Sequence, residues 1–346
     1  MNILSKAINA LKNEIKIWSL LRGIIALLPF AFLYLRTNNP LWLQSSVLTM
    51  ATLIVEERLE LTALGVLLHG FIVIIMLYLL FLTQLKPVLY VISCSLAAMT
   101  IFWITMMGNK LRHLGSWTFI PAIILATEFA AETQPTKLLQ QAPQFLPYLL
   151  VALLPSLLIA QYDKMKAFYK KQVTHYHPLR LRGLEDLGEQ NPYMENMISM
   201  AIAVCISAFL VEYFHMENGQ WMIWGTASVI TGDIATSPQK LRQRAIGVSI
   251  GVPSGILLGQ FLIPNTSLNL TLTACCVFLT LVAFRRYIIA YTFRCLFVAI
   301  AVMLATHSAS VASERFTHVI IGGLIGLVCV MFCHFISRIQ SDFVKK

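Results

Sequence analysis

Long apolar runs separated by short polar stretches cover most of this chain. A membrane-spanning helix needs about 20 predominantly apolar residues, so we count each long run as one crossing. Residues that follow one another at helical spacing within the runs favour helices throughout. The pattern predicts an all-α membrane protein with about twelve transmembrane segments, at 18–35, 41–55, 61–82, 88–107, 115–131, 145–162, 194–214, 220–232, 245–263, 268–284, 287–306 and 316–336.

Two of these segments, 41–55 and 220–232, are short, and they occupy the same place in each half of the chain. Trp42 near the start of the first lies opposite Trp221 in the second, and each segment ends in an acid, Glu56 or Asp233. Because six segments return the chain to the side where it started, we expect two parallel six-segment repeats. They span residues 1–162, which open with an amphipathic surface helix, and 194–346, joined by a cytoplasmic linker at 163–193.

The stretch 219–263 carries the most unusual pattern. A basic turn with Lys240, Arg242 and Arg244 follows the second short segment, and we expect it to contact headgroups. The next segment has glycines at four-residue spacing, which puts them on one helix face where another backbone can approach closely; they are Gly247, Gly251, Gly255 and Gly259, with Pro253 between them. In transporters, a short or Gly/Pro-interrupted segment indicates a solute site.

Composition supports the membrane assignment and the orientation. The chain is 58% hydrophobic and only 12% charged, which leaves too little polar surface for a soluble domain. With the N-terminus inside, most of the 26 lysines and arginines fall in cytoplasmic segments, apart from Arg36, Lys86, Lys137 and Arg315 outside and Arg294 within a span. We therefore expect both termini in the cytoplasm, and the net charge of +10 needs no nucleic acid partner.

The sequence offers no chemistry typical of an enzyme. The seven cysteines fall in apolar segments and lack metal-ligand spacing with histidine, so we expect no disulfide framework, no metal and no cofactor. No phosphate-binding glycine loop and no nucleophile beside a base appears. These absences argue against an enzyme and against ATP-driven transport by this chain alone.

Arg294 is the most informative single charge. It follows Arg286 by eight residues, which places it about 12 Å into the membrane at a rise of about 1.5 Å per residue. A guanidinium there could bind a carboxylate through two parallel hydrogen bonds. The alternative is a structural pair with Asp233, Glu56 or a helix-end carbonyl.

Aromatic and hydroxyl side chains of the short segments are candidates for the rest of a binding site. Trp224, Trp221 and Trp42 could supply flat walls for an aromatic ring, and Thr226 lies between the tryptophans and the acid of its segment. The alternative for the tryptophans is an interfacial belt, which suits Trp221 and Trp42 better than Trp224.

Titratable groups in or near the spans are candidates for proton coupling. Asp233 and Glu56 end the short segments, Glu128 and Glu212 lie near the outer ends of their spans, and His69 aligns with Gly251 of the second repeat and should face the bundle interior. A desolvated carboxylate or imidazole can exchange protons during transport. The alternatives are ordinary loop acids and a packed structural histidine.

These patterns together resemble the fusaric acid resistance and aromatic acid exporter family of bacterial inner-membrane proteins. The resemblance rests on the tryptophan-bearing short segment, on Arg244 followed by Gly247 and Gly251, and on a last helix that opens with Arg315 and His318. It implies efflux of aromatic carboxylic acids or similar organic anions. In many relatives a periplasmic adaptor (membrane fusion) subunit takes part, whereas the large cytoplasmic domain of many relatives is missing here.

The resulting expectation is a proton-driven exporter in the bacterial inner membrane. Its partners would be an organic anion, membrane lipid and a periplasmic adaptor, with a homo-oligomer left open. A passive organic-anion channel and a membrane scaffold in envelope assembly are the alternatives. An arginine-lined pore would also select anions, so counterflow is the assay that separates a carrier from a channel.

Overall fold

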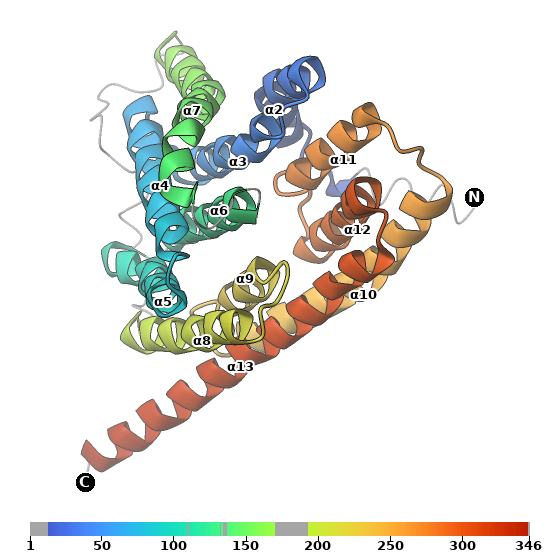
Figure 1. Cartoon of the computed structure of the whole chain (residues 1–346). Coiled ribbons are helices and arrows are strands. Elements are labelled where there is room, and N and C mark those ends of the chain that lie inside the picture. Colours follow the sequence, from blue (N-terminus) through green and yellow to red (C-terminus); the bar gives the residue numbers. More distant parts are fainter. Residues whose placement is uncertain (1–12, 109–110, 132, 134–136, 170–192, 345–346) are drawn as a thin grey trace, which may run out of the picture. The chain divides into compact units, whose positions relative to one another are not determined.

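A computed structural model describes residues 13–108, 111–131, 133, 137–169 and 193–344. Within these ranges the chain is helical, and the all-α prediction is confirmed (Figure 1). The α-helices are α2 (Ile17–Thr37), α3 (Leu41–Leu59), α4 (Ala63–Thr83), α5 (Pro87–Trp103), α6 (Arg112–Ala131), α7 (Leu138–Tyr169), α8 (Tyr193–Tyr213), α9 (Gln220–Val229), α10 (Thr236–Phe261), α11 (Ser267–Leu279), α12 (Tyr287–Thr306) and α13 (Ala309–Val344), with a 3-10 helix, η1 (Ile104–Met107), after α5.

Eight of the described helices are long and apolar enough to cross a membrane, namely α2, α4, α5 with η1, α6, α7, α8, α12 and α13. Large apolar side chains such as Ile75, Val88, Leu158 and Phe335 are exposed on their surfaces. A soluble protein would bury such side chains, whereas lipid tails solvate them. The chain is a multi-pass membrane protein.

The helices form two compact units, each built from separate stretches of the chain. The first unit contains Met1–Leu43 and Arg242–Thr317, and the second contains Gln44–Leu241 and His318–Lys346. This division differs from the predicted halves 1–162 and 194–346, so the parallel repeat stays a prediction. The N-terminal amphipathic helix and most of the linker at 163–193 lie outside the described residues, although α7 continues to Tyr169.

In the first unit, α12 packs against both α10 and α11, and α11 also contacts α2. The glycine face of α10 makes the closest approach. A Cβ at Gly251 would collide with the carbonyl oxygen of Thr292, and a Cβ at Gly255 with that of Leu296. The close backbone contact predicted from the glycine spacing is therefore confirmed.

The turn that leads into α12 is tied to the segment before α2. The backbone N–H of Lys16 donates to the carbonyl of Ala283 at 2.7 Å, and that of Arg285 donates to the carbonyl of Glu14 at 2.8 Å. The Glu14 carboxylate also pairs with Arg286 at 2.8 Å. These contacts fix the start of the helix that carries Arg294.

In the second unit, α4 packs against α6 and α7, while α5 lies along α8 (Figure 1). Hydroxyl groups join α3 to α7: Thr49 donates to the carbonyl of Ala152 at 2.6 Å, and Thr52 donates to the Ser156 hydroxyl at 2.8 Å. Inside a membrane such bonds replace the missing hydrophobic drive between helices.

Only one of the two predicted short segments is short. Helix α9 has 10 residues, or about 15 Å at about 1.5 Å per residue, and cannot cross a bilayer. Helix α3 has 19 residues and continues through Glu56 to Leu59. The prediction of a short segment was wrong for α3, because Glu56 is buried at 5% exposure inside the protein instead of ending the helix at the membrane surface.

Candidate functional site

Four arginines of the first unit are almost completely buried: Arg22 on α2, at 8% exposure, and three that lie around Tyr291 of α12. Arg244 on α10 is 2% exposed, Arg294 on α12 is 7% exposed, and Arg315 on α13 is 2% exposed. A charged side chain within a membrane protein is costly and by default indicates function. These three cations around Tyr291 of α12, called the arginine cluster below, form the candidate site.

Arg294 lies at the C-terminal end of α11. Its Nε donates to the Thr280 hydroxyl at 3.2 Å, and its Nη2 lies 3.5 Å from the Thr280 carbonyl oxygen. The side chains that act on it electrostatically are Tyr287, Tyr291, Cys295 and Arg315, with no carboxylate among them. The structural alternative with a helix-end carbonyl is therefore present. Thr280 engages only part of the guanidinium, and N–H groups remain for a ligand.

Arg244 stacks on the ring of Tyr291. Its guanidinium carbon lies 4.5 Å from the ring centroid, and its Nη1 donates to the Tyr287 hydroxyl at 3.3 Å. A cation over an aromatic face is attracted by the ring quadrupole. Arg244 was expected to contact headgroups, and its burial shows that this was wrong.

Tyr291 is the centre of the cluster. The Arg294 guanidinium carbon lies 6.0 Å from the centroid of its ring, and Arg315 acts electrostatically on both Tyr291 and Arg294. Tyr291 is fully buried, yet its hydroxyl has no hydrogen-bond partner among the described residues. An unsatisfied buried hydroxyl costs free energy, so a polar group that binds here would relieve that cost.

Sequence reasoning missed Tyr291 and misplaced Arg315. Arg315 reads as an outer-loop charge because it precedes the last apolar run, but α13 already begins at Ala309. The signal that could have located Tyr291 is its spacing: it is three residues before Arg294, which puts both on one side of α12.

The short helix α9 packs closely on α13 within the second unit. A Cβ at Gly322 would collide with the carbonyl oxygen of Met222, and one at Gly326 would lie 2.7 Å from the carbonyl oxygen of Thr226. The Thr226 hydroxyl, fully buried, lies 2.9 Å from the Gly322 carbonyl oxygen and 3.0 Å from that of Met222. This hydroxyl thus already serves the contact between α9 and α13.

The three predicted tryptophans are all partly buried. The ring of Trp221 lies 6.4 Å from that of His318, a buried residue of α13, at a tilt of 56°. Trp221 and Trp224 on α9 belong to the second unit, whereas Trp42 at the start of α3 belongs to the first. The structure therefore places the three residues on two units, and their contact with substrate stays a prediction.

The proton-coupling candidates differ in their surroundings. Asp233 is exposed, and its Oδ1 accepts a hydrogen bond from the backbone N–H of Ala235 at 2.9 Å, an arrangement typical of a loop acid. Glu128 and Glu212 are half-buried, and Glu212 acts electrostatically on Tyr90 and Cys94. Burial therefore favours Glu56 over Asp233 as a group removed from water.

His69 on α4 is 3% exposed, as expected for a residue that faces the bundle interior. The backbone of Trp117 on α6 lies near its ring, but neither ring nitrogen makes a hydrogen bond of normal geometry to the described residues. A packed structural histidine normally has such a partner. The role of His69, as a proton carrier or as a packed structural residue, therefore stays a prediction.

Comparisons with known proteins find similarities over parts of the chain. An uncharacterized protein of Haemophilus influenzae is 27% identical over 143 residues, which cover 39% of this chain and 19% of that protein. The matched region is thus about a fifth of that relative's length. No solved structure matches. Residues 204–329, which include α9, α10 and the arginine cluster, match the family described as fusaric acid resistance protein-like.

Proposed function

We propose that this chain exports aromatic carboxylic acids or similar organic anions across the bacterial inner membrane, driven by the proton gradient. The observation that carries the proposal is the arginine cluster: Arg294 has no carboxylate among the groups that act on it, and it lies beside two more buried cations. Three guanidinium groups thus lie around Tyr291. An anion that enters gains Coulomb energy in a region of low dielectric constant.

The geometry suits a carboxylate better than a neutral solute. Arg294 can present its outer N–H groups in parallel to the two carboxylate oxygens, and the unpartnered Tyr291 hydroxyl can donate to one of them. The ring of Tyr287 stacks on that of Tyr291, with centroids 5.6 Å apart, and adds a second aromatic ring to the cluster. The family match over residues 204–329 supports the same substrate class.

The proton side of the proposal rests on His69 and Glu56. Both are buried in the second unit, where a change of protonation alters the local charge strongly. A periplasmic adaptor subunit would receive the exported acid, as the family resemblance implies. Both termini would lie in the cytoplasm.

Counterflow in proteoliposomes tests the function. The purified chain, preloaded with unlabelled 4-hydroxybenzoate, should exchange it for labelled 4-hydroxybenzoate from outside. The exchange rate should fall roughly tenfold or more in Arg294→Gln and clearly in Arg294→Lys, because each buried charge-assisted hydrogen bond contributes roughly 1.5–3 kcal/mol. Arg285→Gln, which changes an exposed arginine close to α12, should exchange at the wild-type rate.

Other outcomes would change the proposal. Full exchange by Arg294→Lys would contradict the proposal that Arg294 binds the carboxylate through two parallel hydrogen bonds. A steady anion current without exchange would favour the passive channel, which the same buried arginines could also serve. Exchange of uncharged 4-hydroxybenzyl alcohol at the rate of the acid would contradict anion transport.

A further inference from the structure

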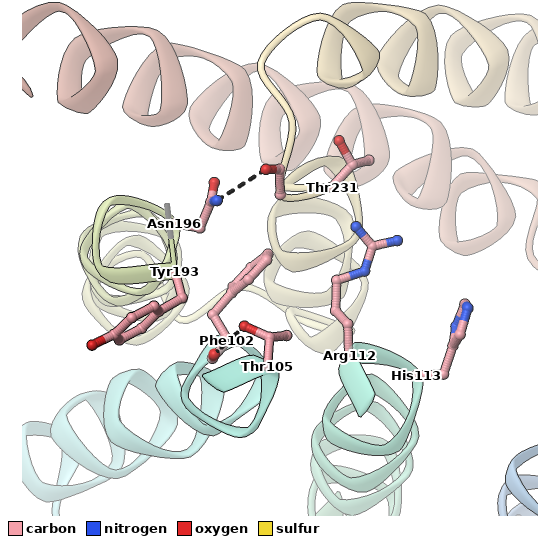
Figure 2. Close-up of a pocket in the computed structure, with 8 residues that line it drawn as sticks. Phe102, Thr105, Arg112, His113, Tyr193, Asn196 and Thr231 are labelled. Atoms are coloured by element: carbon pink, nitrogen blue, oxygen red, sulfur yellow. Dashed lines mark hydrogen bonds between the residues drawn. The ribbon is translucent and has the colours of Figure 1, made fainter. Parts of the chain in front are cut away.

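A cavity in the second unit is lined by none of the residues that the sequence predicted to bind substrate. Its volume is about 220 Å³, and it opens where the ends of several helices meet (Figure 2). On the predicted topology this is the cytoplasmic side of the membrane. Its lining comes from the end of α5 and η1, the starts of α6 and α8, and the loop after α9: Phe102, Thr105, Arg112, His113, Tyr193, Asn196, Thr231 and Gly232.

Arg112 is the cation among the residues that line the cavity, and no Asp or Glu is among them. The guanidinium of Arg112 extends toward the loop at Thr231 (Figure 2) and lies against Gly232. Arg112 has no ion pair with any described residue. His113 accompanies it, with the Arg58 guanidinium 2.9 Å from its Nδ1, and Lys240 also acts on His113. Glu57 acts on Arg58.

Backbone geometry adds to this positive character and fixes the shape. Arg112 is the first residue of α6, where the helix dipole favours an anion. Asn196 donates to the Gly232 carbonyl at 2.9 Å and holds the loop in place. Gly232 has φ 89°, and a Cβ there would lie 3.0 Å from the Phe102 ring, so a larger residue would not fit.

The hydroxyl groups of the two threonines in the cavity are already engaged. The Thr105 hydroxyl donates to the Phe102 carbonyl at 2.6 Å, and Thr231 contacts the Thr236 hydroxyl at 2.6 Å. Arg112 is therefore the donor best placed to bind an incoming anion. The Phe102 ring, which extends between Asn196 and Arg112 in Figure 2, offers an apolar face next to that donor.

We propose that this cavity is a second binding site for a small aromatic carboxylate, where an acid is bound on the cytoplasmic side before it is transported. Arg112 holds the carboxylate, Arg58 beside His113 adds positive charge, and Phe102 contacts the ring. The proposal rests on the proposed function for the identity of its ligand, but the site itself is independent of the arginine cluster.

Binding of 4-fluorobenzoate to the full chain in lipid nanodiscs, followed by fluorine NMR, tests the site. Wild-type protein should bind it, and Arg112→Gln should raise Kd roughly tenfold or more, since it removes a charge-assisted hydrogen bond. Arg242→Gln, an exposed cation of the adjacent basic turn, should leave Kd unchanged. Arg112→Lys keeps the charge and serves as a second variant if the first does not fold; it should raise Kd several-fold.

The outcomes separate this site from the proposed function. Weakened binding in Arg112→Gln, with wild-type affinity for this site in Arg294→Gln, would support two distinct sites. Unchanged binding in both Arg112 variants would overturn the proposal, while counterflow by wild-type protein would still support transport. Inorganic phosphate that displaces 4-fluorobenzoate at equal concentration, or an equal Kd for uncharged 4-fluorobenzyl alcohol, would also overturn the assignment to an aromatic carboxylate.

Discussion

Tyr291 combines two properties that rarely occur together at one residue: complete burial and a hydroxyl without a partner. A residue that only packs would gain from losing that hydroxyl, because removal of an unsatisfied buried polar group is neutral or stabilising. A residue that binds an anion would lose affinity. The substitution Tyr291→Phe separates these roles while it keeps the ring under Arg244.

We expect Tyr291→Phe to unfold at the wild-type temperature or slightly above it, and to show a several-fold higher KM for 4-hydroxybenzoate. Thermal unfolding in detergent and counterflow at varied substrate concentration measure the two quantities. Tyr287→Phe is the matched control. The Tyr287 hydroxyl accepts a hydrogen bond from Arg244, so this variant should be less stable than the wild-type protein. An unchanged KM in Tyr291→Phe would restrict Tyr291 to packing.

His69 permits a second prediction about a single residue. In His69→Leu an apolar side chain replaces a buried imidazole that makes no hydrogen bond of normal geometry to the described residues, so the fold should keep its stability. Counterflow, which needs no gradient, should continue, whereas accumulation of substrate driven by an imposed pH gradient should stop. His215→Asn, at an exposed histidine with φ 49°, should retain both activities. Gradient-driven accumulation by His69→Leu would exclude His69 from coupling.

The sequence predicted the burial of Arg294 and His69 because each lies several turns inside an apolar run. It could not predict that Arg244 is buried, since a cation at the end of a span usually reaches the headgroups. The stacking of Arg244 on Tyr291 depends on the contact between α10 and α12. Such a contact across 47 positions of sequence follows from packing, and spacing along one helix does not reveal it.

At the scale of the helix, the glycine face of α10 determines how closely that helix approaches α12. In Gly251→Ala the new Cβ would meet the Thr292 carbonyl, which is backbone and cannot rotate away. We expect a loss of stability of about 1–3 kcal/mol from overpacking, measured by thermal unfolding in detergent. Ile250→Ala, which changes a neighbour on the same helix that is 54% exposed, should cost much less. Equal costs would mean that α10 and α12 can separate without penalty.

The contact between α9 and α13 gives a prediction about Thr226. In Thr226→Val the shape is nearly kept but the hydrogen bond to the Gly322 carbonyl is lost, and such bonds within membranes contribute about 0.6–1.7 kcal/mol. We expect a stability loss of that size and an unchanged KM. Gly322→Ala, which disturbs the same helix contact, is the matched comparison. A raised KM at unchanged stability would instead assign Thr226 to substrate binding.

Helix positions were predictable to the extent that apolar runs define them. Helix α12 has the predicted bounds, and α9 is short as predicted. The sequence failed at α3, because Glu56, Glu57 and Arg58 read as the end of an apolar run although they continue the helix. Charged residues in a sequence are taken to mark the end of a membrane segment, because they are expected to be in water. Glu56 is an exception, since it is buried inside the protein.

At the scale of the whole molecule, the sequence predicted a multi-pass helical protein correctly. It could not predict the two compact units, since each joins stretches from both halves of the chain. The arginine cluster lies in the first unit, and the cavity at Arg112 lies in the second. We therefore propose that both units recognise anions, with the transported carboxylate held at Arg294.

A structure of the full chain with bound 4-bromobenzoate tests this central claim most directly, because bromine identifies the ligand unambiguously by its scattering. The account predicts that in the first unit the carboxylate lies within hydrogen-bonding distance of Arg294 and the Tyr291 hydroxyl. If an actively transporting preparation bound the acid without occupancy at the arginine cluster, these arginines would be structural and the claim would be contradicted.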